Sequence, residues 1–298
     1  MDQLINAIHE GDLKSIARSI TIVENELPGY RDLLKEININ QSIPLIGITG
    51  PPGAGKSSLV NKLIQKLIDQ QKRVAIIAVD PSSPFNLGAI LGDRIRMSDH
   101  FTDPNVYIRS LASRGSLGGL AEKVIEVTDI LRSGPFDYVL VETVGVGQSE
   151  VEIAGLADTT VVVLVPESGD EIQTMKAGLM EVADIFVVNK SDRSGADAFA
   201  KNLKSLIETK KKTDWSIPVL KTVATENVGL DELIEKINSH LKLETQNERK
   251  AFLLADKAIK LIRSYRSKDI DKEKMIHEIL KELNKQDFNL YVYISKYV

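Results

Sequence analysis

The sequence predicts an α/β fold with a mostly parallel sheet, helices on both faces and helical extensions at both ends of the chain. The first observation is the stretch GPPGAGKS at residues 50–57, which has the G-x-x-x-x-G-K-S spacing of a phosphate-binding loop. The second is its context, because a short apolar run at 43–48 precedes it and an amphipathic helical stripe at 59–68 follows it. The third is the alternation of strand and helix patterns as far as about residue 242. Together they predict the P-loop NTPase class.

The composition sets limits on the function. The 298 residues are 43% hydrophobic and 27% charged, which is typical of a globular protein with a substantial core. The net charge of −4 gives no reason to expect a nucleic acid or an anionic membrane as partner. The absence of cysteine excludes disulfides and thiolate metal sites and favours a cytoplasmic location. The apolar runs are too short to span a bilayer, and the first residues do not resemble a signal peptide.

The chain is expected to have three parts. Residues 1–41 predict helices, broken at Pro28 and Gly29, that form an N-terminal extension. Residues 42–243 form the nucleotide-binding domain, and residues 244–298 form a C-terminal helical arm. Strands are expected at 43–48, 73–80, 106–111, 136–143, 159–165, 184–189 and 218–223. Helices are expected at 59–68, 118–131, about 170–183, 197–211, 230–242, 248–265 and 271–285. The arm either caps the core or mediates dimerisation, of which we favour dimerisation.

Phosphate binding accounts for the residue types in the loop at 50–57. Glycines allow the backbone to reach positive φ and to approach phosphate oxygens closely. Backbone N–H groups and the helix dipole then favour the anion. Lys56 supplies a cation to the terminal phosphates, and the Ser57 hydroxyl can ligate Mg²⁺. The expected nucleotide contacts are Gly50, Pro51, Pro52, Gly53, Ala54, Gly55, Lys56, Ser57 and Ser58.

A second motif, NKSD at residues 189–192, follows a predicted strand and has the N-K-x-D spacing of a guanine-binding loop. The Asp192 carboxylate can accept hydrogen bonds from N1–H and the exocyclic amine of guanine, and adenine has neither donor at that edge. The stem of Lys190 can cover one face of the base, and Asn189 can tie this loop to the phosphate-binding loop. A second base-contacting loop is expected at Val223, Ala224 and Thr225.

Acidic residues at strand ends are candidates for a metal site. Glu142 begins the sequence ETVG, in the place of the Asp-x-x-Gly element of GTPases, and can hold Mg²⁺ directly or through water. Gly145 can donate its backbone N–H to a γ-phosphate. Asp80 and Asp93 can face the same ion, but alternatively Asp80 initiates a turn with Pro81 and Asp93 caps a helix.

A further segment at 169–176, GDEIQTMK, follows another strand and is a candidate nucleotide-sensing loop, with Lys176 at its end. Alternatively, it is a helix N-terminus whose acidic residues favour the dipole. The four histidines, His9, His100, His240 and His277, are scattered along the chain and form no ligand pattern.

The motifs GPPGAGKSS, VDPSSP, LGDRIRM, ETVGVGQSE, GDEIQTMKAG and NKSD occur in this order. Over residues 10 to about 242 the chain thereby resembles the methylmalonyl-CoA-mutase-associated G-protein chaperones, also labelled lysine/arginine/ornithine transport-system ATPases. The last fifty residues match that family only in being helical.

The resemblance implies a homodimeric GTPase that binds GTP and GDP with Mg²⁺ and serves an adenosylcobalamin-dependent acyl-CoA mutase. It implies that the GTPase gates cofactor loading and protects the mutase. By motif matching, Lys56, Asp93, Glu142, Gly145 and Lys176 would take part in hydrolysis or its control, and Ser57, Asp80, Asp93 and Glu142 would form the metal site. The alternatives are a nickel-insertion metallochaperone GTPase, which the cysteine-free sequence disfavours, and an accessory NTPase of basic amino-acid transport, which NKSD disfavours.

Overall fold

The computed structural model describes residues 1–80, 97–112, 123–143, 149–168, 181–208, 215–243, 248–266 and 272–283. Asp93, Gly145, Lys176 and the predicted loop at 169–176 lie outside these ranges. The chain divides into two units, Met1–Lys250 and Ala251–Val298, and the first contains the sheet.

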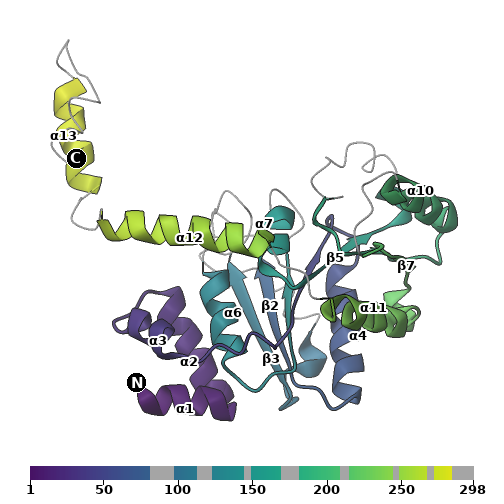
Figure 1. The fold of residues 1–298 in the computed structure, drawn as a ribbon, viewed down its shortest axis with the longest axis horizontal. Coiled ribbons are helices and arrows are strands. Elements are labelled where there is room, and N and C mark those ends of the chain that lie inside the picture. The colour runs from purple at the N-terminus through teal and green to yellow at the C-terminus, as the bar shows by residue number, and fades with distance from the viewer. Residues whose placement is uncertain are drawn as a thin grey trace. The chain divides into compact units, whose positions relative to one another are not determined.

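Seven strands form one parallel sheet in the order β3-β2-β4-β1-β5-β6-β7 (Figure 1). They are β1 Leu45–Thr49, β2 Val74–Asp80, β3 Val106–Ala112, β4 Tyr138–Glu142, β5 Thr159–Leu164, β6 Ile185–Val188 and β7 Val219–Lys221. The central strands β1 and β5 are buried along their whole length, which explains their continuous apolar sequence. The predicted parallel sheet is confirmed, and each predicted strand overlaps an observed one.

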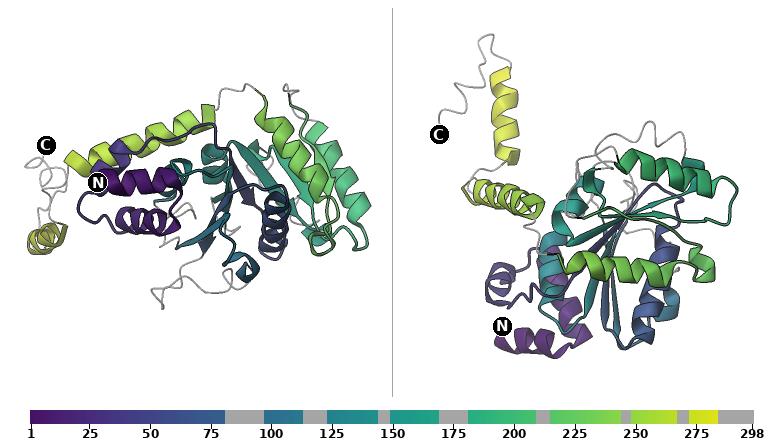
Figure 2. Two further views of the ribbon diagram at one scale, coloured as in Figure 1. Left: turned by 90° about the horizontal axis from the view of Figure 1, so that it is seen from below. Right: turned by 45° about the vertical axis from the view of Figure 1, so that its right-hand side comes forward.

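Helices cover both faces of the sheet (Figures 1 and 2). On one face, α4 (Lys56–Asp69) and α11 (Leu230–Leu241) pack on residues such as Ile46, Ile48 and Val163. On the other, α10 (Ala196–Glu208) packs on Val162 and Phe186. The helix α6 (Val124–Arg132) packs against β4, and α7 (Ser149–Leu156) packs against β1 and β5.

The helix α7 was not predicted from the sequence. Its segment, SEVEIAGL, has no separate polar and apolar stripes, and Ile153, Ala154 and Leu156 are buried. Ile153 packs directly over Gly47 of β1, where an added Cβ would overlap it. The absence of a side chain at Gly47 therefore allows α7 to lie close to the sheet.

The N-terminal helices α1 (Asp2–Glu10), α2 (Leu13–Glu24) and α3 (Tyr30–Glu36) belong to the first unit. The helices α2 and α3 pack against α6. Two ion pairs join this layer to the core, one between Glu24 and Arg109 of β3 and one between Glu26 and Lys123, which precedes α6. The predicted break is present, since Gly29 has a φ of 87°.

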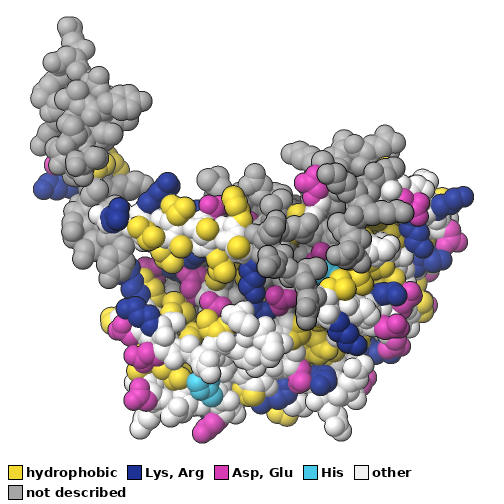
Figure 3. Space-filling view, in the orientation of Figure 1, with side chains coloured by type: hydrophobic (Ala, Val, Ile, Leu, Met, Phe, Trp, Pro, Cys, Tyr) yellow, Lys and Arg dark blue, Asp and Glu magenta, His cyan; other side chains and the backbone are white. Residues whose placement is uncertain are grey.

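The second unit contains most of α12 (Glu248–Arg266) and all of α13 (Lys272–Leu283). Large apolar side chains lie exposed along α12 (Figure 3). Among them, Phe252 is 71% exposed. The others are Leu254, Ile259, Leu261 and Ile262 of α12, and Ile276 and Leu280 of α13. Within the described ranges, none of the helices is both long and apolar enough to cross a membrane.

Candidate functional site

The phosphate-binding loop connects the end of β1 to the start of α4, as the sequence predicted. Gly50, Gly53 and Gly55 have φ values of 139°, 77° and 85°, which favour glycine. A Cβ on Gly50 would overlap the carbonyl oxygen of Val163, and a Cβ on Gly55 would overlap the amide of Asn189. Glycine at these two positions therefore allows β5 and the NKSD loop to lie against the phosphate-binding loop.

Lys56 and Ser57 are the first two residues of α4, and both side chains are buried. The Lys56 Nζ donates hydrogen bonds to the carbonyl oxygens of Gly50 (2.8 Å) and Pro51 (3.1 Å), so the ammonium lies over the loop. The Ser57 hydroxyl donates a 2.7 Å hydrogen bond to Oε1 of Glu142, the last residue of β4. The two residues are far apart in the sequence and meet because β1 and β4 are neighbours in the sheet.

The oxygen groups at these strand ends fit a magnesium ion, because Mg²⁺ prefers a few carboxylate and hydroxyl oxygens together with phosphates. Ser57 and Glu142 would hold it, and the ion would neutralise charge on the phosphates. Asp80 is the last residue of β2, the other neighbour of β4, and its side chain is not described. A buried 2.8 Å hydrogen bond from Thr143 to Thr49 joins the ends of β4 and β1 beside the site.

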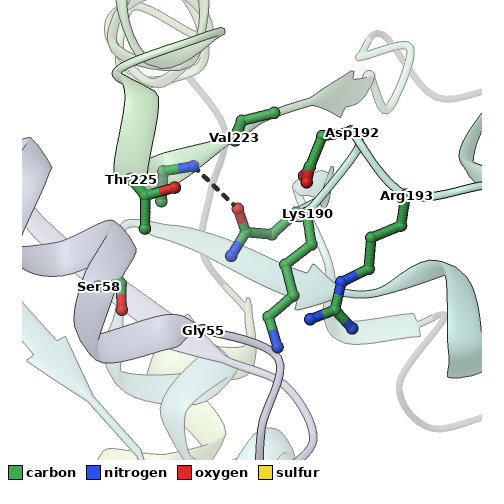
Figure 4. Close-up of a pocket in the computed structure, with 9 residues that line it drawn as sticks. Gly55, Ser58, Lys190, Asp192, Arg193, Val223 and Thr225 are labelled. Atoms are coloured by element: carbon green, nitrogen blue, oxygen red, sulfur yellow. Dashed lines mark hydrogen bonds between the residues drawn. The ribbon is translucent and has the colours of Figure 1, made fainter.

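Asn189 connects three segments around the predicted base site. Its Nδ2 donates to the carbonyl oxygen of Ala54 in the phosphate-binding loop (2.9 Å). Its Oδ1 accepts from the Thr222 hydroxyl (3.1 Å) and from the backbone N–H of Ala224 (3.2 Å; dashed in Figure 4). A second link crosses to the same loop, since the Lys190 Nζ donates to the carbonyl oxygen of Gly53 (2.7 Å).

A pocket of about 190 Å³ lies between these segments (Figure 4). It is lined by Gly55, Ser58, Asn189, Lys190, Asp192, Arg193, Val223, Ala224 and Thr225. Eight of these nine residues were predicted to bind the nucleotide, and the structure brings them to one place. The Asp192 side chain is exposed, so its carboxylate is accessible to a ligand.

Arg193 also lines the pocket and was missed by the sequence analysis. Its position immediately after the N-K-x-D pattern was the only signal. The guanidinium forms a 2.6 Å ion pair with Glu167, in the 3₁₀ turn η2 (Pro166–Ser168) that follows β5. The hydrogen bond from Arg193 lowers the pKa of Glu167 below its ordinary value, so the pair is charged at neutral pH.

A charged cluster lies at the amino end of the central strand β1, opposite to the end that carries the phosphate-binding loop. The Asp158 carboxylate accepts hydrogen bonds from the backbone N–H of Leu45 (2.8 Å), from Arg132 and from Lys250 (3.3 Å). Nearby on α6, burial raises the pKa of Asp129 to about 6, despite the opposing charges of Arg132 and Lys250. None of these residues is among those that line the pocket in the described part of the chain.

Comparison with known protein families assigns the chain to a class. A family model described as methylmalonyl-CoA mutase-associated GTPase MeaB matches residues 16–278. The chain belongs to the MeaB family. Because the match covers most of the chain, it includes most of the N-terminal helix α2, the whole sheet and part of the C-terminal arm.

Curated relatives agree with the MeaB assignment. A Pyrococcus abyssi protein named "Putative GTPase" is 51% identical over 245 residues, which cover 80% of this chain and 76% of the relative. The GTPase ArgK of Escherichia coli is 33% identical over 96% of this chain and 87% of its own length. The mouse methylmalonic aciduria type A homolog is 34% identical over 78% of this chain and 61% of its own length.

Among solved structures, the fold resembles a LAO/AO transport system kinase with a TM-score of 0.73 and 25% identity, covering 99% of this chain and 95% of that one. This likeness confirms the predicted P-loop NTPase fold. The family and its relatives also confirm the predicted enzyme class. This MeaB-family protein is a GTPase and binds guanine nucleotides.

Proposed function

We propose that this MeaB-family GTPase is a chaperone of an adenosylcobalamin-dependent acyl-CoA mutase, for which it gates cofactor loading and prevents inactivation. The family description names association with methylmalonyl-CoA mutase, and one relative is named for methylmalonic aciduria. A cytoplasmic location accords with the absence of cysteine.

The observation that carries the nucleotide part of this proposal is the connection that Asn189 makes. Through it, the NKSD loop, the phosphate-binding loop and the loop at Ala224 form one pocket. In this proposal the phosphates lie against Lys56 and the backbone of residues 50–57, and the base lies beside Asp192. Adenine would leave the Asp192 carboxylate without a donor, so the site selects guanine.

Magnesium and the catalytic groups form the second part of the proposal. Ser57 and Glu142 hold Mg²⁺ together with Asp80 and Asp93, and Gly145 contacts the γ-phosphate. Ser57 and Glu142 support this part, because a buried hydroxyl and a buried carboxylate lie together beside the phosphate-binding loop. Lys176 lies in the segment proposed to transmit the partner's signal to the nucleotide.

A homodimer is the third part of the proposal, with residues 244–298 as the dimerisation arm. The exposed apolar side chains of α12 and α13 support it, because a concentration of exposed large apolar side chains is typical of a protein interface.

The alternative functions differ in their ligands. A nickel-insertion chaperone needs a cluster of metal ligands, and the described residues contain no group of three or more candidate side chains. An accessory NTPase of amino-acid transport is suggested by the name of the related transport system kinase. That function would require a membrane partner, and an ATP-dependent version would conflict with the Asp192 pocket.

The test is GTP turnover at increasing concentrations of an adenosylcobalamin-dependent acyl-CoA mutase from the same organism. Alone, the protein should turn over on the order of 10⁻⁴–10⁻² per second, the range of GTPases that act without a stimulating partner. The mutase should stimulate turnover several-fold, and the Lys56→Ala variant should show no turnover at any mutase concentration. Lys176→Ala should bind GTP within a few-fold of the wild type but lose most of the stimulation.

Three results decide between these functions. Absence of stimulation by any such mutase, with normal GTP binding, would reject the chaperone proposal and leave the GTPase assignment intact. Preference for ATP would favour the transport function, and stoichiometric binding of Ni²⁺ by the nucleotide-free protein would favour the metallochaperone.

A further inference from the structure

Arg193 stands on the wall of the pocket, next to Asp192 and outside the N-K-x-D pattern. We propose that its guanidinium stacks on the purine of the bound nucleotide, so that Arg193 sets nucleotide affinity without reading the identity of the base. The inference rests on the proposed position of the base beside Asp192. It assigns to this side chain a role in the binding step that is separate from the role of Asp192.

The backbone of Arg193 is fixed on both sides. Its N–H donates to the carbonyl oxygen of Lys190 (3.1 Å), and its own carbonyl oxygen accepts from the N–H of Ala196, the first residue of α10 (3.4 Å). The tight turn therefore places Asp192 and Arg193 together at the mouth of the pocket. Figure 4 shows the side chains of Lys190 and Arg193 leaving this turn in the same direction.

The ion pair with Glu167 holds the end of the side chain. Glu167 comes from the turn after β5, whereas Arg193 comes from the loop after β6, so the pair connects two neighbouring loops of the sheet. The two side chains are 48% and 52% exposed. An ion pair at such exposure contributes little to the free energy of unfolding, because solvent screens it. We therefore expect the ion pair to orient the guanidinium for ligand binding and to add little to the stability of the fold.

The chemistry of guanidinium makes both contacts compatible. A carboxylate binds the edge of the planar group through its N–H donors, and the two faces stay available for an aromatic ring. A purine base presents a large π face, and arginine stacks on such faces in nucleic-acid complexes. A lysine at this position would keep the charge and the ion pair but would offer no planar surface. This difference separates stacking from simple attraction between charges.

The experiment measures dissociation constants for GDP and IDP by calorimetry in the full-length protein. IDP lacks the exocyclic amine that Asp192 is proposed to bind, so the ratio of the two constants reports recognition of the base edge. We expect Arg193→Ala to weaken both ligands by the same factor, about 5- to 100-fold, as is usual for removal of a stacking side chain. Arg193→Lys should lose most of the same affinity. Glu167→Gln should have a smaller effect, because it frees the guanidinium without removing it.

The matched control is Lys221→Ala. Lys221 forms an ion pair of the same length, 2.6 Å, with Asp197, its side chain is 51% exposed, and it does not line the pocket. This variant should bind both nucleotides as the wild type does. Melting temperatures of all variants should agree within a few degrees, which shows that a change in affinity does not come from loss of the fold.

Three results would overturn the inference. They are wild-type affinity in Arg193→Ala, full recovery in Arg193→Lys, or a GDP-to-IDP ratio changed by Arg193→Ala. Asp192→Asn, measured in parallel, should bring the ratio towards one. If it does so while Arg193→Ala has no effect, the stacking role fails and the base site stands. If Asp192→Asn leaves the ratio unchanged, the proposed base site itself fails.

Discussion

The Ser57 hydroxyl and the Glu142 carboxylate form a buried 2.7 Å hydrogen bond between the first turn of α4 and the end of β4. If both groups hold magnesium, their loss should raise the requirement for the ion. We expect Ser57→Ala and Glu142→Gln each to increase the Mg²⁺ concentration for half-maximal GTP turnover by about 10- to 100-fold. Titration of turnover with MgCl₂ measures this. Ser239→Ala, a serine on α11 that donates to the carbonyl oxygen of Glu235, is the control and should not change the requirement.

Asn189 is buried and joins three segments, so its removal should affect both stability and binding. Asn189→Ala leaves the N–H of Ala224 and the carbonyl oxygen of Ala54 without this partner. We expect the free energy of unfolding to fall by about 1–3 kcal/mol, measured by urea denaturation, and GDP binding to weaken in calorimetry. Asn25→Ala removes an exposed hydrogen bond to Thr21 and should have little effect on either quantity. Unchanged stability of Asn189→Ala would contradict the connecting role.

The raised pKa of Asp129 predicts a defined pH dependence of stability. Burial moves this pKa from its ordinary value of 3.8 to about 6, so between these values the folded chain binds more protons than the unfolded chain. The free energy of unfolding should therefore decrease as the pH rises from about 4 to 6, by at most about 3 kcal/mol. Asp129→Asn removes this decrease and should be more stable than the wild type at pH 7.5.

Urea denaturation of both proteins at pH 5 and pH 7.5 measures the Asp129 effect. Asp32→Asn is the control, because Asp32 is on the surface of α3, where its side chain is 66% exposed. It should follow the wild-type profile. If Asp129→Asn also follows that profile, Asp129 is not protonated in the folded protein at mildly acidic pH.

The ion pair between Arg132 and Asp158 should contribute strongly to stability. The Arg132 side chain is only 3% exposed, so removal of its partner would leave a buried charge uncompensated. We expect Asp158→Ala to lower the free energy of unfolding by about 3–5 kcal/mol. Asp231→Ala breaks the exposed pair with Lys66 and should cost less than about 1 kcal/mol. Equal losses in the two variants would contradict this difference.

The fold and most of the pocket could be predicted from the sequence because their signals are local. An apolar run followed by GPPGAGKS specifies a strand, a loop and a helix. NKSD directly follows an apolar run that predicts a strand, so its position in the fold can also be predicted from a few adjacent residues. The contacts that could not be predicted join distant residues. Asp158 bonds to Leu45 across 113 positions, and Arg109 pairs with Glu24 across 85. Such contacts depend on strand order, which the local pattern does not specify.

Arg193 and α7 show two other reasons for missed features. Arg193 follows a known pattern without being part of it, and only the ion pair with Glu167 and the pocket wall give it a context. The segment of α7 lacks a polar stripe because α7 packs closely on β1, so its periodicity gave no signal. In both cases the role of the segment depends on residues that lie near it in space but far from it in the sequence.

The carboxylate of Asp158 has a practical consequence for the design of shortened proteins. It binds the first residue of β1, Leu45, and also Lys250, the last residue of the first unit. A truncation after Leu243 would remove Lys250, and with it one partner of the carboxylate that binds the start of β1, the strand that leads to the phosphate-binding loop. Loss of activity in that shortened protein would therefore not show that the helical unit beyond residue 250 is required. A protein ending after residue 250 retains this cation and is the appropriate test of the second unit, residues 251–298.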